Sequence, residues 1–151
     1  MKKTPDSDCS GEIGAACIGA RLRVINRVVT GVYDDAIRPF GMKISQVNIL
    51  VVASQLEAAT PSKIGSILKM DRSTISRNVE RMKRKGWLKK AFSTDDNRSH
   101  LLKVTPKGKK TLTDILPAWR DAQKETIKIL GKKTTGAIFE QGNKIMMSGF
   151  Q

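Results

Sequence analysis

Apolar residues recur along the first part of the chain at the three- and four-residue spacing of an amphipathic helix. We expect one long helix from about residue 12 to 40, ended by Pro39 and Gly41. Residues 1–11 are polar and mixed in charge, which predicts a disordered tail. A stripe of this length needs a cover, and a second copy of the chain would supply one. The stripe consists of Ile13, Cys17, Ala20, Val24 and Val28.

Two helices follow at short intervals. The apolar run at residues 47–56 is rich in β-branched residues and would also suit a strand, but Ser45 as a cap and the interspersed polar residues favour a buried helix. Thr60-Pro61 then has the residues of an N-cap and a first helical position, so a short helix should begin there.

A basic helix within residues 70–86 is predicted next. Its apolar residues Ile75, Val79 and Met82 share one face, Asp71 can cap its start, and Gly86 can end it. The opposite face carries small hydroxyls near the N-terminus and Arg side chains further along. On its own this helix could equally be a solvated basic surface helix.

The apolar period changes to two after Gly86. Residues 88–93 and 100–104 can each alternate, and residues 94–97 are turn-rich, which predicts a β-hairpin. Thr105-Pro106 begins another long helix, which Pro117 should kink or break. A last helix at about 135–147 is weakened by Gly136 and Gly142. The expected fold class is mainly α with a small β-hairpin.

Composition and charge favour a polyanionic partner. The 151 residues suit one domain, and the formal net charge is +14. Residues 72–110 hold 13 Lys and Arg against three acidic residues, so most of the excess lies in a quarter of the chain. Nucleic acid and an acidic membrane surface both remain possible partners on charge alone.

Several classes of protein find little support. No apolar run reaches the roughly 18 residues of a membrane span, and residues 1–11 lack the apolar core of a secretory signal, so we expect a cytoplasmic location. Two cysteines make no disulfide framework, and His100 is the one histidine. Neither a metal site nor a cofactor site is predicted, and no catalytic constellation indicates an enzyme.

The order of the predicted elements favours a DNA-binding role for the basic helix over a solvated surface helix. A short helix, a turn, a basic helix and then a hairpin are typical of a winged helix-turn-helix, in which the second helix enters the DNA major groove and the hairpin is the wing. At the wing tip, the narrow minor groove would attract Arg98 while Asp96 holds its guanidinium group. The bland alternative is a polar turn whose charges only solvate it.

Two stretches resemble the MarR family of bacterial transcriptional regulators. One is residues 62–88. The other, residues 96–108, is similar to the family's wing pattern D-x-R-x-x-x-L-x-L-T-x-x-G, with Val104 in place of the second Leu. The resemblance extends over about residues 12–130, and Gly65 departs from the Ala that is common in the family.

The resemblance implies a homodimer with intertwined terminal helices above two winged-helix lobes. We expect dimerisation helices at 12–40 and 106–148, and a DNA-binding lobe at 44–105, in a single domain of residues 12–151. The implied function is sequence-specific binding of double-stranded DNA at a pseudo-palindromic promoter site, usually as a repressor that a small-molecule effector or an oxidant releases.

DNA contacts follow from the positions of side chains on the basic helix. By resemblance, the residues that would face the major groove are Arg72, Ser73, Thr74, Ser76, Arg77 and Asn78. Further along the helix, Arg81, Arg84 and Lys85 would hold phosphates. No aromatic-lined effector site can be identified, and Tyr33 and Trp119 are candidates only as aromatics.

Two alternative functions stay open. A thiol sensor could use Cys17, with Cys9 as its resolving thiol, although burial as a small apolar residue is the plainer explanation of Cys17 on the apolar stripe. A basic winged helix could instead be a protein- or RNA-interaction module, because the fold alone does not determine function.

Overall fold

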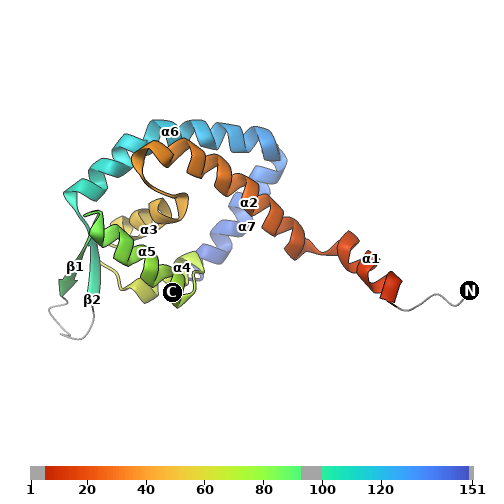
Figure 1. The fold of residues 1–151 in the computed structure, drawn as a ribbon, viewed down its shortest axis with the longest axis horizontal. Coiled ribbons are helices and arrows are strands. Elements are labelled where there is room, and N and C mark those ends of the chain that lie inside the picture. Colours follow the sequence, from red (N-terminus) through yellow and green to blue (C-terminus); the bar gives the residue numbers. More distant parts are fainter. Residues whose placement is uncertain (1–5, 93–99, 150–151) are drawn as a thin grey trace, which may run out of the picture.

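The chain folds into a winged-helix lobe attached to a group of long helices (Figure 1). The structure is a computed structural model and describes residues 6–92 and 100–149. Helices α2 and α6 lie side by side, and α7 turns back from the end of α6 toward α4. The first helix, α1, points away from the rest of the molecule. These outer helices are α1 (Asp6–Ala16), α2 (Ile18–Ile37), α6 (Pro106–Leu130) and α7 (Lys132–Met147).

The winged-helix lobe is built around one hydrophobic core. The predicted helix at 47–56 is confirmed as a helix and contributes the buried side chains of Ile49 and Leu50, while Ile64 and Met82 pack against them from the next two helices. A 3-10 turn, η1, joins the lobe to α2. The elements of the lobe and this turn are η1 (Arg38–Phe40), α3 (Ile44–Gln55), α4 (Pro61–Leu68), α5 (Arg72–Arg84), β1 (Leu88–Phe92) and β2 (His100–Val104).

The predicted hairpin is confirmed by two antiparallel strands. Leu88 of β1 pairs with Val104 of β2, and Phe92 pairs with His100 at the other end. Leu102 is buried and also bonds through its backbone to Ala59, so the segment between α3 and α4 extends the pairing by one residue. The hairpin is therefore fixed to the lobe along its base.

The start of α6 is tied to the end of α5. Thr105 caps α6 as predicted by accepting from Gly108 N, and its hydroxyl donates to the carbonyl of Gly86 at 2.6 Å. A Cβ at Gly108 would lie 2.4 Å from the carbonyl oxygen of Trp87. Glycine is needed at position 108 because the backbone of α6 approaches the backbone of Trp87 too closely for a Cβ. This close approach explains why the wing pattern ends in Gly.

The prediction for the N-terminal region was wrong in two respects. Residues 6–11, expected in a disordered tail, belong to α1, and the expected single helix is interrupted at Cys17. Glycines weaken a helix here, and the side chains around the break are exposed, so no packing maintains a continuous helix. Arg21 instead donates to the carbonyls of Gly14, Ala15 and Cys17, which stabilises the interruption.

Two smaller predictions also need correction. The N-cap of α3 is Lys43 and not Ser45: Gln46 accepts from Lys43 N, and Asp34 accepts from Ile44 N at 2.7 Å. Helix α6 is not broken at Pro117. The carbonyl that loses its partner there belongs to Thr113, which is exposed, so water can bond to it and the helix continues.

Candidate nucleic-acid interface

Asp71 fixes the N-terminus of α5. Its carboxylate accepts from Thr74 N at 2.8 Å, from the Thr74 hydroxyl at 2.6 Å and from the Ser73 hydroxyl at 2.7 Å. These bonds, first those from the Thr74 and Ser73 hydroxyls, hold the pKa of Asp71 well below its usual range. The predicted cap is confirmed, and it orients the first turn of the helix that we expect to meet DNA.

The cap also limits what Ser73 and Thr74 can offer a base. Because both hydroxyls donate to Asp71, only their lone pairs are available, and they can accept from the amino groups of adenine or cytosine. Ser76 bonds to none of the described residues and can still both donate and accept. On α5, Ser73 can therefore only accept a hydrogen bond from a base, whereas Ser76 can both donate and accept.

Most side chains of the predicted reading surface are exposed. Thr74 and Asn78 are half-buried, and Asn78 Nδ2 donates to the carbonyl of Thr74 at 3.0 Å, so this amide is partly used within the helix. The exposed members are Arg72, Ser73, Ser76, Arg77, Arg81 and Arg84. Asp96 and Arg98, predicted at the wing tip, lie outside the described residues.

A groove of about 790 Å³ runs between α4 and the first turns of α5. Arg72 and Ser76 of α5 and Ser62 and Ser66 of α4 line the groove, and His100 of β2 is also among its lining residues. Sequence reasoning did not include these α4 serines. Their i, i+4 spacing on the polar face of a short helix was the signal that could have revealed them.

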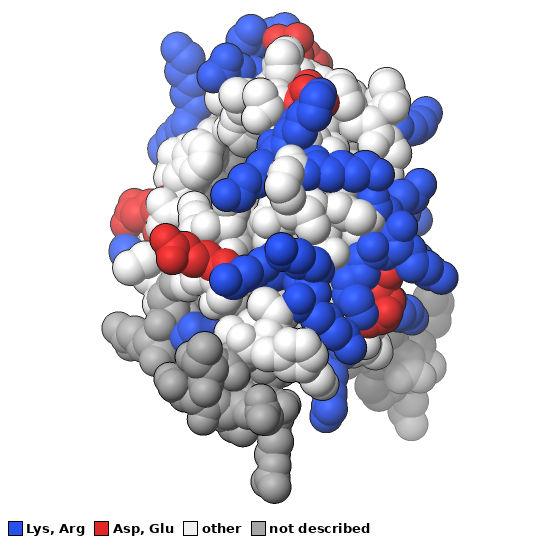
Figure 2. Space-filling model, turned by 90° about the vertical axis from the view of Figure 1, so that its left-hand side faces the viewer, with Lys and Arg blue, Asp and Glu red and all other residues white. Residues whose placement is uncertain are grey.

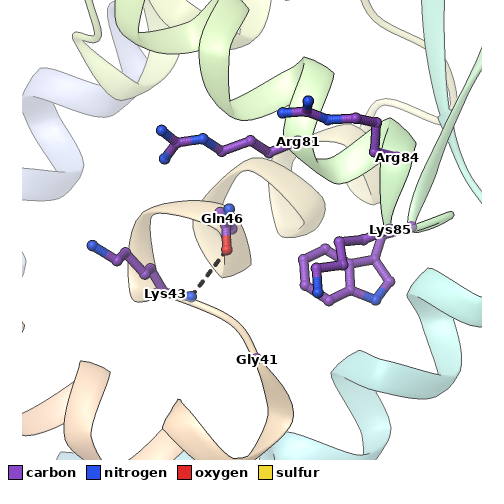
Figure 3. Close-up of a pocket in the computed structure, with 7 residues that line it drawn as sticks. Gly41, Lys43, Gln46, Arg81, Arg84 and Lys85 are labelled. Carbon is purple, nitrogen blue, oxygen red and sulfur yellow. Dashed lines mark hydrogen bonds between the residues drawn. The ribbon is translucent and has the colours of Figure 1, made fainter.

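A cationic pocket of about 520 Å³ lies beside the second half of α5 (Figure 3). Arg81 and Arg84 extend from α5 above it, and Lys43 extends from the start of α3 on the facing wall. Lys85 and Trp87 close the side near the end of α5, and no acidic residue lines the pocket. We call these seven lining residues the cationic pocket: Gly41, Lys43, Gln46, Arg81, Arg84, Lys85 and Trp87.

The charges in this pocket are available to an anion. Among the described residues, Lys43, Arg81, Arg84 and Lys85 form no ion pair. The nearby acid on α5, Glu80, pairs with Lys83 at 2.7 Å, and that lysine is the main cause of its lowered pKa. Lys43 precedes Arg81 by 38 positions and lies outside α5, so sequence reasoning on the helix alone could not place it here.

Basic side chains also dominate the surrounding surface. Figure 2 shows the end of the molecule that carries the hairpin, with Lys and Arg spread over most of the face and few acidic side chains between them. The excess of Lys and Arg in residues 72–110 of the sequence therefore contributes to a basic surface on one end of the folded molecule. A surface of this kind attracts a polyanion before any specific contact forms.

The described residues give little support to a thiol sensor, a metal site or a membrane span. Cys17 caps α2, its sulfur accepting from Ala20 N at 3.4 Å, and is half-buried instead of packed in a core as expected; Cys9 is exposed on α1. The described ranges contain no group of three or more potential metal ligands. Over the same residues, no helix is both long and apolar enough to cross a membrane.

A model of the MarR family matches residues 42–100, which include α3, α4, α5 and β1. The HTH-type transcriptional regulator Hpr of Bacillus pumilus is 29% identical over 96 residues, which are 64% of this chain and 47% of Hpr. The chain thus aligns with about half the length of that curated relative.

Solved structures share the fold over most of the chain. The M. tuberculosis transcriptional regulator MOSR, crystallised in complex with DNA, has a TM-score of 0.72 and 28% identity, with 85% of this chain and 96% of MOSR covered. Bordetella bronchiseptica BpsR, whose DNA binding is regulated by 6-hydroxynicotinic acid, has a TM-score of 0.74 and 20% identity, with coverages of 85% and 91%.

The described geometry and these similarities agree on one assignment. The helices α4 and α5 with their hairpin form a winged helix-turn-helix, and the fold as a whole is similar to that of a solved regulator over 85% of the chain. The family consists of transcriptional regulators and not enzymes. Residues 42–100 of the chain match the MarR family, and the chain shares the fold of solved winged-helix transcriptional regulators.

Proposed function

We propose that this chain is a dimeric, sequence-specific DNA-binding repressor that acts on a pseudo-palindromic promoter site and is released by a small-molecule effector. The observation that carries the proposal is α5: its exposed polar edge adjoins the α4 groove, and its C-terminal half borders the cationic pocket. A role on the chromosome also fits the cytoplasmic location expected from the sequence.

The two halves of α5 have different tasks in this proposal. Arg72, Ser76 and Arg77 near the N-terminus contact base edges, where an Arg can donate two bonds to a guanine. Arg81, Arg84 and Lys85, with Lys43 on the facing wall, surround backbone phosphates. Ser62 and Ser66 on the α4 side of the groove are placed to donate to phosphates of the same groove edge.

Dimerisation is supported by apolar side chains that the single chain leaves uncovered. Ile18 is 71% exposed and Val24 is 63% exposed on α2, and Phe139 and Ile145 of α7 are also more than half exposed. Exposed apolar side chains gathered on neighbouring elements mark interaction surfaces. A second copy of the chain is the partner that gives two equivalent lobes for a pseudo-palindromic site.

Release by an effector is proposed from BpsR, whose DNA binding a small molecule regulates. Repression is the usual consequence when a regulator bound at a promoter blocks the polymerase. The thiol-sensor alternative gains no support, because Cys17 serves as a helix cap among the described residues.

Selection of bound duplexes from a random pool tests the proposal. We expect an enriched motif with two half-sites about one helical turn apart. On the enriched duplex, affinity should fall steeply with salt as counterions leave the phosphates. A monomer that enriches no duplex would instead support the protein- or RNA-interaction module.

A further inference from the structure

The start of α5 directs two hydroxyl protons away from any partner outside the protein. The Ser73 hydroxyl donates to Asp71 Oδ1 at 2.7 Å, and the Thr74 hydroxyl donates to Asp71 Oδ2 at 2.6 Å. A hydroxyl has one proton, so what each side chain can still offer is the lone pairs of its oxygen. We call Asp71, Ser73 and Thr74 the acceptor cluster.

The direction of these bonds is fixed by the charge on Asp71. Its pKa is held well below the usual range by the same hydroxyls, so the carboxylate is ionised at physiological pH and has no proton to donate. Hydroxyl-to-carboxylate bonds of this length are charge-assisted and about twice as strong as neutral ones. Turning either hydroxyl proton toward a base would lose such a bond.

The bases differ in whether they can pair with an acceptor. In the major groove, adenine presents its N6 amino group and cytosine its N4 amino group, and both can donate. Guanine presents N7 and O6, and thymine presents O4, all of which only accept. Adenine or cytosine therefore pairs with the acceptor cluster, whereas guanine or thymine places two acceptors against each other.

We propose that Asp71 determines base specificity: by accepting the protons of the Ser73 and Thr74 hydroxyls, it makes the first turn of α5 select adenine or cytosine in the strand that it faces. Asp71 acts through the two hydroxyls and is therefore a positioning residue. The inference rests on the proposed function, to which it adds the class of base recognised by one part of the helix.

Other side chains on α5 recognise a different class of base. Among the described residues, Arg77 forms no ion pair, and its guanidinium group can only donate, which suits guanine. Ser76 can donate or accept and discriminates little. Each half-site should therefore combine a base chosen by donors with a base chosen by the acceptor cluster.

Asp71→Asn should reverse the polarity of one hydroxyl and leave the other unchanged. Oδ1 accepts from both Thr74 N and the Ser73 hydroxyl, whereas Oδ2 accepts only from the Thr74 hydroxyl. An Asn that keeps its oxygen in the Oδ1 position retains the cap and places its NH₂ group beside the Thr74 hydroxyl. That hydroxyl must then accept from the amide, and its own proton becomes free to donate to guanine or thymine.

Parallel selections from one random pool of duplexes, with the full-length parent protein and with Asp71→Asn, test the proposal. At the position read by Thr74, we expect the parent to favour adenine or cytosine, and Asp71→Asn to shift the ratio of these bases to guanine and thymine by about tenfold. The rest of the motif should persist. An unchanged motif in Asp71→Asn would overturn the proposal, and so would loss of every preference in a variant that circular dichroism shows to be folded.

Thr74→Val identifies the position and does not depend on the folding of Asp71→Asn. Without its hydroxyl, the variant should lose the preference at one position of each half-site, with no shift to the opposite bases. If the parent favours guanine or thymine at that position, the proposal is wrong. A general loosening of the helix would weaken all positions alike, so the reversal in Asp71→Asn separates positioning from a merely structural role.

Glu80→Gln is the matched control, because it makes the same change from carboxylate to amide on α5. The Glu80 carboxylate pairs with Lys83 at 2.7 Å and bonds to neither hydroxyl of the acceptor cluster, so the selected motif should stay the same. A shift at the position read by Thr74 in Glu80→Gln would attribute the effect to charge alone and overturn the proposal. A parent protein that enriches no motif would refute the proposed function as well, whereas an enriched motif that Asp71→Asn leaves unchanged refutes only this inference.

Discussion

The winged-helix lobe and the outer helices differ in how completely their apolar side chains are buried. The lobe encloses its large apolar side chains, with Ile49, Leu50 and Ile64 fully buried. On α1, α2 and α7, side chains of the same type, such as Ile13, Val24 and Phe139, are mostly exposed. One region completes its core from its own chain, and the other has apolar faces that the single chain leaves exposed.

This difference links stability to assembly. Burial of apolar surface is the main favourable contribution to folding, so the lobe should remain folded at any protein concentration. The exposed apolar side chains of the outer helices would gain the same contribution on association with the proposed second copy, so the order of these helices should depend on protein concentration. In the proposed function, DNA recognition and dimerisation therefore lie in regions with different stability.

The largest expected effect is in the core of the lobe. Ile49→Ala, at a fully buried position of α3, should lower the free energy of unfolding by about 2–5 kcal/mol. Val51→Ala, two residues away and 39% exposed, is the control and should cost much less. Urea denaturation at two protein concentrations measures both, and similar losses would refute the contrast between buried and exposed positions.

The next effect is on the outer helices. Val24→Asp places a charge on the exposed apolar stripe, and we expect the dimer dissociation constant to rise about tenfold or more, equivalent to about 1.4 kcal/mol. Light scattering over a dilution series measures it. Arg23→Asp, adjacent but off the stripe, controls for the added charge. An unchanged dissociation constant in Val24→Asp would mean that α2 is not an interface.

A smaller effect concerns Asp71. Because its pKa is lowered in the folded chain, its carboxylate stabilises the lobe at pH values above its unfolded pKa near 4, and this contribution is lost as pH falls further. Asp71→Asn should therefore lower the urea midpoint at pH 7 and approach the parent value under acid. A difference that grows as the pH is lowered would contradict the cap.

Local signals predicted the lobe well. Thr60-Pro61, Asp71 and Gly86 specify helix boundaries through caps and a left-handed residue, and the structure places them where expected. Such signals act over three or four residues and can be read directly from sequence. The start of α3 was misplaced because one of its caps, Asp34, comes from ten residues away.

The outer helices and the pockets were harder to predict. The break at Cys17 depends on Arg21 reaching back to free carbonyls, which periodicity cannot reveal. Lys43 joins Arg81 only after α3 packs near α5, and Ser66 reaches the groove only after α4 packs against α5. Sequence patterns thus identified the recognition helix but not the side chains that other elements bring beside it.

The division of labour on α5 can be tested with one measurement, the salt dependence of affinity for a selected operator and for a scrambled duplex, in Arg77→Ala and Arg84→Ala. We predict that Arg77→Ala loses about 1–3 kcal/mol on the operator and much less on the scrambled duplex. Arg84→Ala should weaken both equally and reduce the salt slope by about one. Equal losses on both duplexes for Arg77→Ala, or an operator-specific loss for Arg84→Ala, would contradict this assignment.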